Sequence, residues 1–484
     1  MIELRDVSFR YENSDNDSLS HLNLSITQGE CILLCGKSGC GKTTITKLIN
    51  GLIPHMVLGK KEGGVYIKGK CVDAIPMYEL SQIVGSVFQN PKSQFFNLDT
   101  DSELTFAIEN QALPAKEIKQ RLVNITEKLK IGSLRKRNIF ELSGGEKQLI
   151  AVASVCIANP EILVLDEPTA NLDLCAVNIL RDLLIQLKAA GTTIIIAEHR
   201  LSYLCDIVDR VLYMSEGKIE SEYLGTDFFH LSNVERVRMG LRRLQDDVMC
   251  SLGHTHHSKK ISLRVNNVSF RYGKKTVINN ISFTAHKGDI IGIAGKNGVG
   301  KSTFCRVLCG LHSLSSGNIQ LEGKALSDKE RRNVSYIVMQ DVNHQLFADS
   351  VLEEMVLSQE HPDIEKANTL LQEFYLDSYK DHHPLALSGG QKQRLAIAVS
   401  MMLQKQIYIF DEPSSGLDYQ SMCSIRDQIA KLSQKGTIIF LITHDMELLD
   451  SLCNRCLFLE KDKVVEIFPD KRNLSEIVGA LLCL

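Results

Sequence analysis

The chain has no excess of basic residues: 55 lysines and arginines stand against 58 aspartates and glutamates, a formal net charge of −3. Because nucleic-acid-binding domains usually present a basic surface, this balance gives no electrostatic indication of a nucleic-acid partner. Low-complexity arms are also missing from the sequence. The length of 484 residues is enough for two or three domains, each with a sizeable core.

Long hydrophobic runs are missing too. No segment reaches the roughly 18 to 20 uncharged apolar residues that cross a bilayer, and the apolar runs 192–197 and 437–443 have the length of buried strands. A role at a membrane would therefore need a membrane-embedded partner. Residues 2–9 resemble a strand and not the charged and apolar stretches of a secretion signal, so we expect a cytosolic chain with reduced thiols.

The sequence lacks paired Cys-x-x-Cys motifs. Cys453 and Cys456 have the spacing of a metal-binding pair, but no second pair completes a zinc site among the 14 cysteines. We interpret them as small apolar residues near a helix end. Cys305 and Cys309 lie one helical turn apart and should pack in an interior.

The chain does contain one set of motifs twice, in the same order. Each set comprises a glycine-rich loop, a glutamine, a Leu-Ser-Gly-Gly sequence, an Asp-Glu pair and a histidine. The motifs lie at 36–43, Gln89, 142–145, 166–167 and His199, and again at 295–302, Gln340, 387–390, 411–412 and His444. In both sets the signature serine precedes the aspartate by 23 residues, and the aspartate precedes the histidine by 33. A repeat this long predicts two homologous domains.

The order of elements predicts the fold of each half. A strand, the glycine loop and a helix come first, followed by an apolar strand ending in Asp-Glu, a helix and a β-branched strand ending at the histidine. This order predicts two α/β domains with largely parallel sheets, at 1–225 and 261–484. The glycine-loop lysine and the signature serine are 101 residues apart in the first half and 87 in the second. Loop length should therefore vary on one side of the site only.

The connector at 226–260 is polar. Ser232 and Glu235 can form a capping box, and a short amphipathic helix is predicted by the apolar spacing of Val234, Val237, Leu241, Leu244 and Val248. We expect a solvated face, not a membrane or nucleic-acid surface, from Arg236, Arg238, Arg242 and Arg243. An exposed tract, with metal binding as the second hypothesis, is expected at His254, His256 and His257.

The glycine loops predict nucleotide binding. Such loops direct backbone N–H groups into one cavity at a helix N-terminus, where they bind phosphate. Lys42 and Lys301 should reach the β- and γ-phosphates, and Thr43 and Ser302 should supply hydroxyls to Mg²⁺. Further ATP contacts are expected from Gly36, Ser38, Gly39, Gly41, Thr44, Gly295, Asn297, Gly298, Gly300 and Thr303.

The Asp-Glu pairs predict metal binding and proton transfer. Asp166 and Asp411 each follow an apolar strand and can hold Mg²⁺ through its water shell. Glu167 and Glu412 come next and could accept the proton of an attacking water.

With the Leu-Ser-Gly-Gly sequences at 142–145 and 387–390, the chain resembles the ATP-binding cassette ATPases over its whole length except the connector. The family's other marks are an aromatic before the glycine loop, a Q-loop glutamine, a D-loop aspartate and a switch histidine. These marks are present at Tyr11, Tyr272, Gln89, Gln340, Asp173, Asp418, His199 and His444. The resemblance implies that both glutamines also serve the metal, that both histidines are catalytic, and that the signatures bind ATP through Ser143, Gly144, Gly145, Ser388, Gly389 and Gly390.

The resemblance also implies how the halves work together. In that family two domains pair head to tail, so Lys42 would share one nucleotide with Ser388, and Lys301 another with Ser143. ATP would hold both faces together, and its hydrolysis would release them.

Local strings are similar to the ATPases of energy-coupling factor importers, which take up vitamins and transition metals; the strings lie at 87–91, 94–96, 197–201 and 340–347. This similarity implies the fused form of those ATPases, peripheral on the cytoplasmic face of the membrane. Its partners would be a transmembrane coupling protein and a substrate-binding membrane protein. Phe95, Phe96, Leu346 and Phe347 would then form a docking surface, with burial in a local core as the alternative.

Two departures separate the halves. Glu146 and Leu149 stand where the second half has Gln391 and Arg394, so the first signature could contact nucleotide or partner differently. Both halves keep the lysine, aspartate, glutamate and histidine, so we expect both to hydrolyse ATP. The alternative functions are a soluble tandem cassette acting on the ribosome or DNA, or the ATPase of another transporter class. Ribosome-acting tandem cassettes usually lack the switch histidine and carry a long charged linker.

Overall fold

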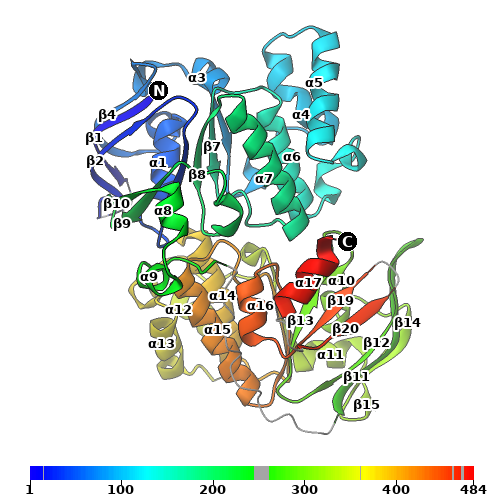
Figure 1. Cartoon of the computed structure of the whole chain (residues 1–484). Coiled ribbons are helices and arrows are strands. Elements are labelled where there is room, and N and C mark those ends of the chain that lie inside the picture. The colour runs from blue at the N-terminus through cyan, green and yellow to red at the C-terminus, as the bar shows by residue number, and fades with distance from the viewer. Residues whose placement is uncertain are drawn as a thin grey trace. The chain divides into compact units, whose positions relative to one another are not determined.

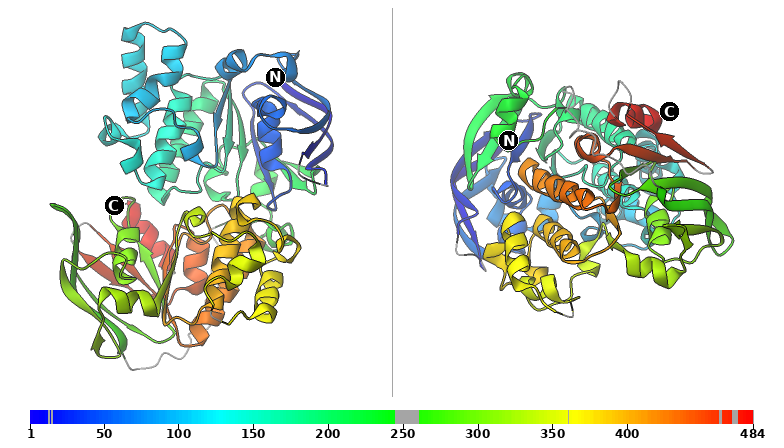
Figure 2. Two further views of the ribbon diagram at one scale, coloured as in Figure 1. Left: turned by 180° about the vertical axis from the view of Figure 1, so that it is seen from behind. Right: turned by 90° about the horizontal axis from the view of Figure 1, so that it is seen from below.

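Each copy of the motif set lies in its own unit. The computed structural model describes residues 1–483 except 13, 15, 245–260, 360, 461–462 and 470–473. The chain divides into unit 1, residues 1–244, and unit 2, residues 245–484. Figures 1 and 2 show the elements of each unit from three directions.

A six-stranded sheet lies at the centre of unit 1, in the order β10-β9-β3-β8-β7-β6. All neighbours pair in parallel except β10, which is antiparallel to β9. The strands are β3 (Cys31–Gly36), β6 (Val84–Val87), β7 (Ile162–Asp166), β8 (Thr193–Ala197), β9 (Arg210–Ser215) and β10 (Lys218–Leu224). The predicted α/β fold and largely parallel sheet are therefore confirmed.

Unit 2 repeats this sheet in the order β16-β17-β18-β13-β19-β20. Again the last strand, β20, is antiparallel to its neighbour. The strands are β13 (Ile290–Ala294), β16 (Ser335–Val338), β17 (Ile407–Asp411), β18 (Ile438–Ile442), β19 (Arg455–Leu459) and β20 (Val464–Ile467).

A four-stranded antiparallel sheet accompanies each central sheet, in the orders β2-β1-β4-β5 and β12-β11-β14-β15. In unit 1 the strands are β1 (Ile2–Tyr11), β2 (Leu19–Ile26), β4 (Gly59–Ile67) and β5 (Lys70–Cys71). In unit 2 they are β11 (Ile261–Tyr272), β12 (Lys275–His286), β14 (Ser316–Leu321) and β15 (Lys324–Ala325).

In unit 1, successive side chains of the central strands alternate between two hydrophobic cores, one on each face of the sheet. Ile32 and Leu34 point to one face of the central sheet, where α1 (Lys42–Ile49) and the antiparallel sheet pack. Leu33 and Cys35 point to the other face, which is covered by α6 (Gly144–Cys156) and α7 (Leu174–Ala189) (Figure 1). Because successive residues of a strand face opposite ways, a continuous apolar strand fits only a sheet buried on both faces.

The remaining helices extend or flank this frame. In unit 1 they are α2 (Leu52–His55), α3 (Met77–Ile83), α4 (Thr100–Asn110), α5 (Ala115–Lys128), α8 (Gly225–Phe229) and α9 (Asn233–Arg238). In unit 2 the helices are α10 (Lys301–Leu308), α11 (Asp328–Val334), α12 (Val351–Val356), α13 (Ile364–Glu373), α14 (Gly389–Met402), α15 (Tyr419–Gln434), α16 (Met446–Leu452) and α17 (Leu474–Cys483). Helices α4, α5 and α6 contact one another, as do α12, α13 and α14.

The connector helix is shorter than predicted. Ser232 and Glu235 form the predicted capping box, but α9 ends at Arg238 and Gly240 follows with a φ of 72°. A left-handed glycine just past the last turn ends a helix because it redirects the chain. The rest of the predicted helix, up to Val248, and the histidine tract lie partly or wholly outside the described residues.

The prediction of a solvated arginine face was wrong for Arg242, which is 7% exposed, and for Arg236. This side chain is fully buried, while the predicted apolar contact Val234 is 62% exposed. The guanidinium lies 4.8 Å from the ring centroid of Phe228 and donates Nη2 to the carbonyl oxygen of the same residue. An aromatic face and a backbone carbonyl can take up a flat guanidinium, which periodicity alone cannot reveal.

The predicted buried strands and cysteines are confirmed. The runs at 192–197 and 437–443 contain the buried strands β8 and β18. Cys305, Cys309, Cys453 and Cys456 are buried; Cys453 follows α16, as expected, whereas Cys456 lies in β19. Within the described ranges, no helix has the length and apolarity to span a bilayer, and no group of three or more metal-ligating side chains occurs.

Candidate nucleotide-binding sites

The two glycine loops have the same backbone conformation. Gly36, Gly39 and Gly41 have φ values of 145°, 79° and 106°, and the matching glycines of unit 2 have 145°, 78° and 108°. A Cβ on Gly36 would lie 2.2 Å from the carbonyl oxygen of Met214, so only glycine fits there. The loops lead from β3 into α1 and from β13 into α10. Backbone N–H groups at such helix starts form anion sites.

In each unit, the lysine of the glycine loop donates hydrogen bonds to carbonyl oxygens of the same loop. Lys42 donates Nζ to the carbonyl oxygens of Gly36 at 3.0 Å and Lys37 at 2.9 Å. Lys301 donates to Gly295 at 2.7 Å and Lys296 at 3.2 Å. Both lysines are more than nine-tenths buried, so their charge lies inside the loop. The position fits a cation that neutralises phosphate oxygens.

In each unit the hydroxyl and the aspartate predicted to hold Mg²⁺ meet. Thr43 Oγ1 donates to Asp166 Oδ1 at 3.2 Å, and Ser302 bonds with Asp411 in unit 2. Burial raises the pKa of both aspartates, and the hydroxyl bond opposes the rise. A hydroxyl and a carboxylate this close present the oxygen ligands that Mg²⁺ prefers, so the donor set fits the ion.

The predicted base and switch histidine also meet. Glu167 accepts a bond from Gln89 Nε2 at 2.9 Å and lies 3.7 Å from His199 Nε2. In unit 2, His444 Nε2 lies 3.5 Å from Glu412 Oε1. Burial, with Asp166 and another nearby carboxylate, raises the pKa of Glu167 to about 8. A buried carboxylate of raised pKa suits general-base chemistry.

Both candidate bases have left-handed backbones. Glu167 has a φ of 46° and Glu412 a φ of 54°, which is uncommon for a residue with a side chain. Each is held by its N–H, which donates to Ala197 and Ile442 on the neighbouring strand at 2.8 and 2.9 Å. Such strain at a carboxylate is typical of functional sites.

Sequence reasoning missed the role of Glu198. This side chain is 3% exposed and accepts bonds from the backbone N–H groups of His199 and Arg200 at 2.7 and 3.1 Å. It also accepts from Thr169 Oγ1 at 2.6 Å and Tyr203 at 3.3 Å. Unit 2 has Thr443 at this place in the repeat. The sequence signals were this difference between the halves and the place of Glu198 in the string at 197–201.

The aromatic residues before the glycine loops have different surroundings. The Tyr11 hydroxyl lies 3.1 Å from Thr44 Oγ1, and Lys47 Nζ is 5.3 Å from the ring centroid. The Tyr272 hydroxyl instead pairs with His312 Nε2 at 2.8 Å. The contact of both rings with ATP stays a prediction.

Each signature serine begins a helix. Ser143 and Ser388 are the N-caps of α6 and α14, with complete capping boxes to Glu146 and Gln391. Glu146 and Gln391 therefore play the same structural part, and Glu146 also pairs with Arg137 at 3.2 Å. Gly144, Gly145, Gly389 and Gly390 form the first turns, where N–H groups can receive an anion.

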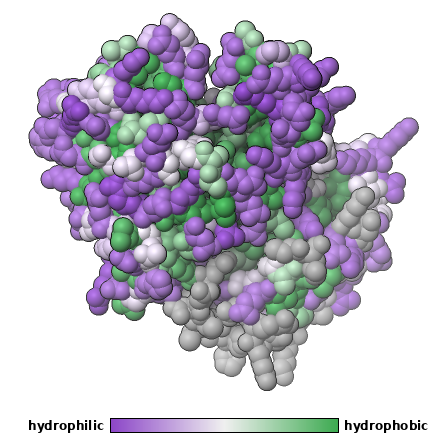
Figure 3. All heavy atoms as spheres, turned by 45° about the horizontal axis from the view of Figure 1, so that its top comes forward, coloured by the Kyte–Doolittle hydropathy of each residue, from purple (hydrophilic) through white to green (hydrophobic). Residues whose placement is uncertain are grey.

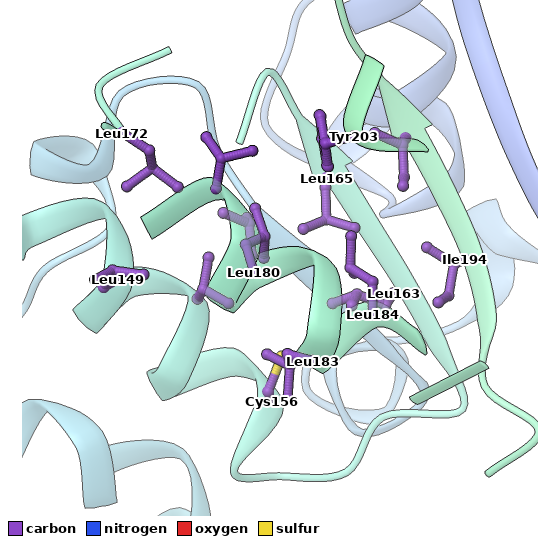
Figure 4. Close-up of a cluster of buried hydrophobic side chains, with 14 of the residues drawn as sticks. Leu149, Cys156, Leu163, Leu165, Leu172, Leu180, Leu183, Leu184, Ile194 and Tyr203 are labelled. Atoms are coloured by element: carbon purple, nitrogen blue, oxygen red, sulfur yellow. The ribbon is translucent and has the colours of Figure 1, made fainter. Parts of the chain in front are cut away.

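The second departure between the halves, Leu149 in place of Arg394, lies in the interior of each unit. Arg394 is buried and donates Nη1 to Ser421 Oγ at 2.6 Å. In unit 1 the matching positions are Leu149 and Ala176, both part of one apolar cluster, in which Figure 4 shows Leu149 on α6 beside side chains of α7. Both partners of the polar contact have been exchanged for apolar residues.

A groove of about 260 Å³ follows the first Q-loop, with Phe96 and Phe106 among its lining residues. The two rings stack at 5.4 Å, and Phe96 is 77% exposed. Phe347 is 74% exposed in unit 2, whereas Leu346 is buried and Phe95 packs partly against the core. Each predicted pair therefore divides into one core and one surface residue. Hydrophilic groups cover much of the face drawn in Figure 3, with apolar residues in smaller patches.

A buried carboxylate fixes each of these loops. Glu103 accepts from the N–H groups of Phe96 and Asn97 at 3.0 and 2.8 Å. Glu354 accepts from those of Phe347 and Ala348, both at 2.7 Å. The exposed phenylalanines are thus held by the backbone beneath them.

Comparison with known proteins gives consistent results. The ABC transporter family model matches residues 19–170 and 278–415. A putative ABC transporter ATP-binding protein of Treponema denticola is 45% identical over 99% of both chains. The putative HMP/thiamine import ATP-binding protein YkoD of Bacillus subtilis is 32% identical, covering 95% of this chain and 90% of that one.

A solved structure shows the same tandem fold. The model of ribosome-bound archaeal Pelota and ABCE1 aligns with a TM-score of 0.69 over 96% of this chain and 78% of that one. Its sequence identity of 20% supports a likeness of fold alone. Together with the matched family model and the full-length relatives, the repeated phosphate, signature and carboxylate geometry shows that this chain belongs to the ABC transporter family, as an ATP-hydrolysing protein with two ATP-binding domains.

Proposed function

We propose that the chain powers a membrane importer of the energy-coupling factor type from the cytoplasmic face of the membrane. The observation that carries this proposal is the exposed phenylalanine after each Q-loop, Phe96 in unit 1 and Phe347 in unit 2, each on a loop fixed by a buried glutamate. An apolar ring held outward at a groove fits a partner helix. The importer named in the YkoD match, together with the local strings, supports uptake as the direction of transport.

The ATP chemistry of the proposal follows from the site. Lys42 and the loop N–H groups would bind the phosphates, and Thr43, Gln89 and Asp166 would hold Mg²⁺, which supplies charge neutralisation. Glu167 lies beside Gln89 and His199, so it can accept the proton of a water attacking the γ-phosphate. The matching residues of unit 2 provide a second set.

We further propose that the two units pair head to tail, so that each ATP is shared between one glycine loop and the other unit's signature. Ser143→Arg should then weaken nucleotide held by Lys301 more than nucleotide held by Lys42, because a bulky cation would occupy the start of α6. Photocrosslinking of an azido-ATP followed by peptide mapping measures the nucleotide bound at Lys42 and at Lys301 separately. Preferential loss at Lys42 would contradict the pairing.

Docking is tested by Phe96→Ser. We expect this variant to lose most of its copurification with integral membrane proteins from detergent-solubilised membranes. Its melting temperature should stay that of the parent, and its basal rate of ATP hydrolysis should stay within about 20% of the parent rate. Leu224→Ser, which removes another exposed apolar side chain of unit 1 from β10, is the matched control and should copurify normally.

A soluble role on the ribosome predicts a different result. The chain would then sediment with ribosomes, and Phe96→Ser would leave membrane association unchanged because there would be none. Normal membrane assembly and transport by folded Phe96→Ser would refute the docking surface itself.

A further inference from the structure

A cavity lies against the second glycine loop. Its volume is about 470 Å³, within the range of small-molecule sites. Its apolar walls come from Val299 of the loop, Phe458 and Leu459 at the end of β19, and Leu481 of α17. Asn297 and Gly298 of its wall are also expected ATP contacts, whereas Lys301, Ser302, Asp411, Glu412 and His444 of the proposed nucleotide chemistry are not among its lining residues.

Unit 1 fills the corresponding place with its own chain. Tyr213 on β9 pairs with Cys35, the residue before the first loop glycine, as Phe458 on β19 pairs with Ala294. The Tyr213 hydroxyl donates to the carbonyl oxygen of Met239 at 2.8 Å. The next residue, Gly240, lies so close to Lys37 that a Cβ there would be 2.9 Å from Lys37 Cε. The turn after α9 therefore covers the outside of the first glycine loop.

The charges at the cavity differ in their pairing. Glu460 is paired with Lys463, with 3.0 Å between Nζ and Oε2. For Lys296, the exposed loop residue at the edge of the cavity, the described part of the chain offers no ion pair or side-chain hydrogen bond. The available charge is therefore positive, and an anionic group would complement it.

We propose that this cavity of unit 2 binds a small, mainly apolar molecule with one anionic group, as an effector of the second nucleotide site. The apolar body would lie between Phe458 and Leu481, with the anion at Lys296. Four lining residues, 296–299, belong to the glycine loop itself. Because ligand and ATP would contact the same loop, their affinities would be coupled, and each would change the other by the same factor.

The test compares two dyes on the full-length chain. The anion 8-anilinonaphthalene-1-sulfonate and its neutral parent N-phenyl-1-naphthylamine differ by one sulfonate and brighten when they enter apolar sites. Leu481→Trp places an indole in the cavity and should weaken both dyes at least about tenfold, since it takes the space of the ligand. Ala480→Trp, on the exposed side of the same helix, should leave both affinities within about twofold.

Charge is tested separately. Lys296→Gln should weaken the sulfonate about two- to fivefold, the value of an exposed ion pair, and leave the neutral dye unchanged. Saturating ATP should change the affinity for the sulfonate, and the sulfonate should change that for ATP by an equal factor. Unchanged binding of both dyes to folded Leu481→Trp would overturn the site, as would equal losses of both dyes in Lys296→Gln. A coupling factor of one would overturn the effector role. If Leu481→Trp melts at a lower temperature than the parent, the Lys296→Gln comparison decides.

Discussion

The exchange of Arg394 and Ser421 for Leu149 and Ala176 predicts a double-mutant cycle. Ser421→Ala removes the acceptor of a buried guanidinium and should lower the free energy of unfolding of unit 2 by about 1.5–3 kcal/mol, the contribution of a hydrogen bond to a charged group. Arg394→Leu together with Ser421→Ala reproduces the apolar pair of unit 1. The double variant should recover most of the loss, because replacing both partners by apolar groups is close to neutral. The coupling energy should be about 1–2 kcal/mol.

Because the sequence contains no tryptophan, the free energy of unfolding can be measured for one unit at a time with an introduced tryptophan. Tyr336→Trp places a single fluorescent reporter in unit 2, and Tyr66→Trp places one in unit 1 as the control. Urea unfolding of the full chain, followed at each reporter, gives the free-energy changes from the midpoint and slope. The midpoint reported by Trp at 66 should not move. Additive losses in unit 2, with a coupling energy below about 0.5 kcal/mol, would refute the pairing of Arg394 with Ser421.

Two further predictions concern unit 1. Gly36→Ala should abolish ATP binding at that site, measured by equilibrium dialysis with labelled ATP, because the new methyl would lie 2.2 Å from a carbonyl oxygen. Gly69→Ala, outside the glycine loop, is the control: its methyl would meet nothing within 4 Å, so only the cost of a left-handed alanine, about 1–2 kcal/mol, should appear. Glu198→Ala should lower kcat about 10- to 100-fold, with a smaller change in KM, because the backbone N–H groups of His199 and Arg200 lose the acceptor that fixes them. Glu198→Gln keeps one oxygen acceptor and should recover part of the rate; equal rates in the parent and Glu198→Ala would refute the positioning role.

Much of the site could be predicted because its chemistry follows the chain. Asp166 and Asp411 end apolar strands, and a parallel sheet brings such strand ends to one edge, where the glycine loops also start. The repetition of the motifs at fixed spacing then indicated that these aspartates are functional and not ordinary polar residues at strand ends. The positive φ angles of the loop glycines and the capping boxes of both signature serines follow from the same local rules.

What could not be predicted depends on contacts between distant segments. Arg236 was expected in solvent because its neighbours alternate like a surface helix, yet Phe228 shields its guanidinium. The inward bond of Arg394 to Ser421 joins residues 27 positions apart on different helices. The division of Phe95 and Phe96 into core and surface depends on the backbone conformation that Glu103 imposes. Periodicity in one sequence contains none of these pairings.

The buried glutamates beneath the Q-loop surfaces have a consequence for how such a chain can change over evolutionary time. Glu103 and Glu354 hold main-chain N–H groups, so the shape of each loop does not depend on which side chain its exposed position carries. A substitution at Phe96 or Phe347 alters what the surface offers while the scaffold below keeps its form. New recognition can therefore arise by single replacements, without an intermediate in which the ATPase core is damaged.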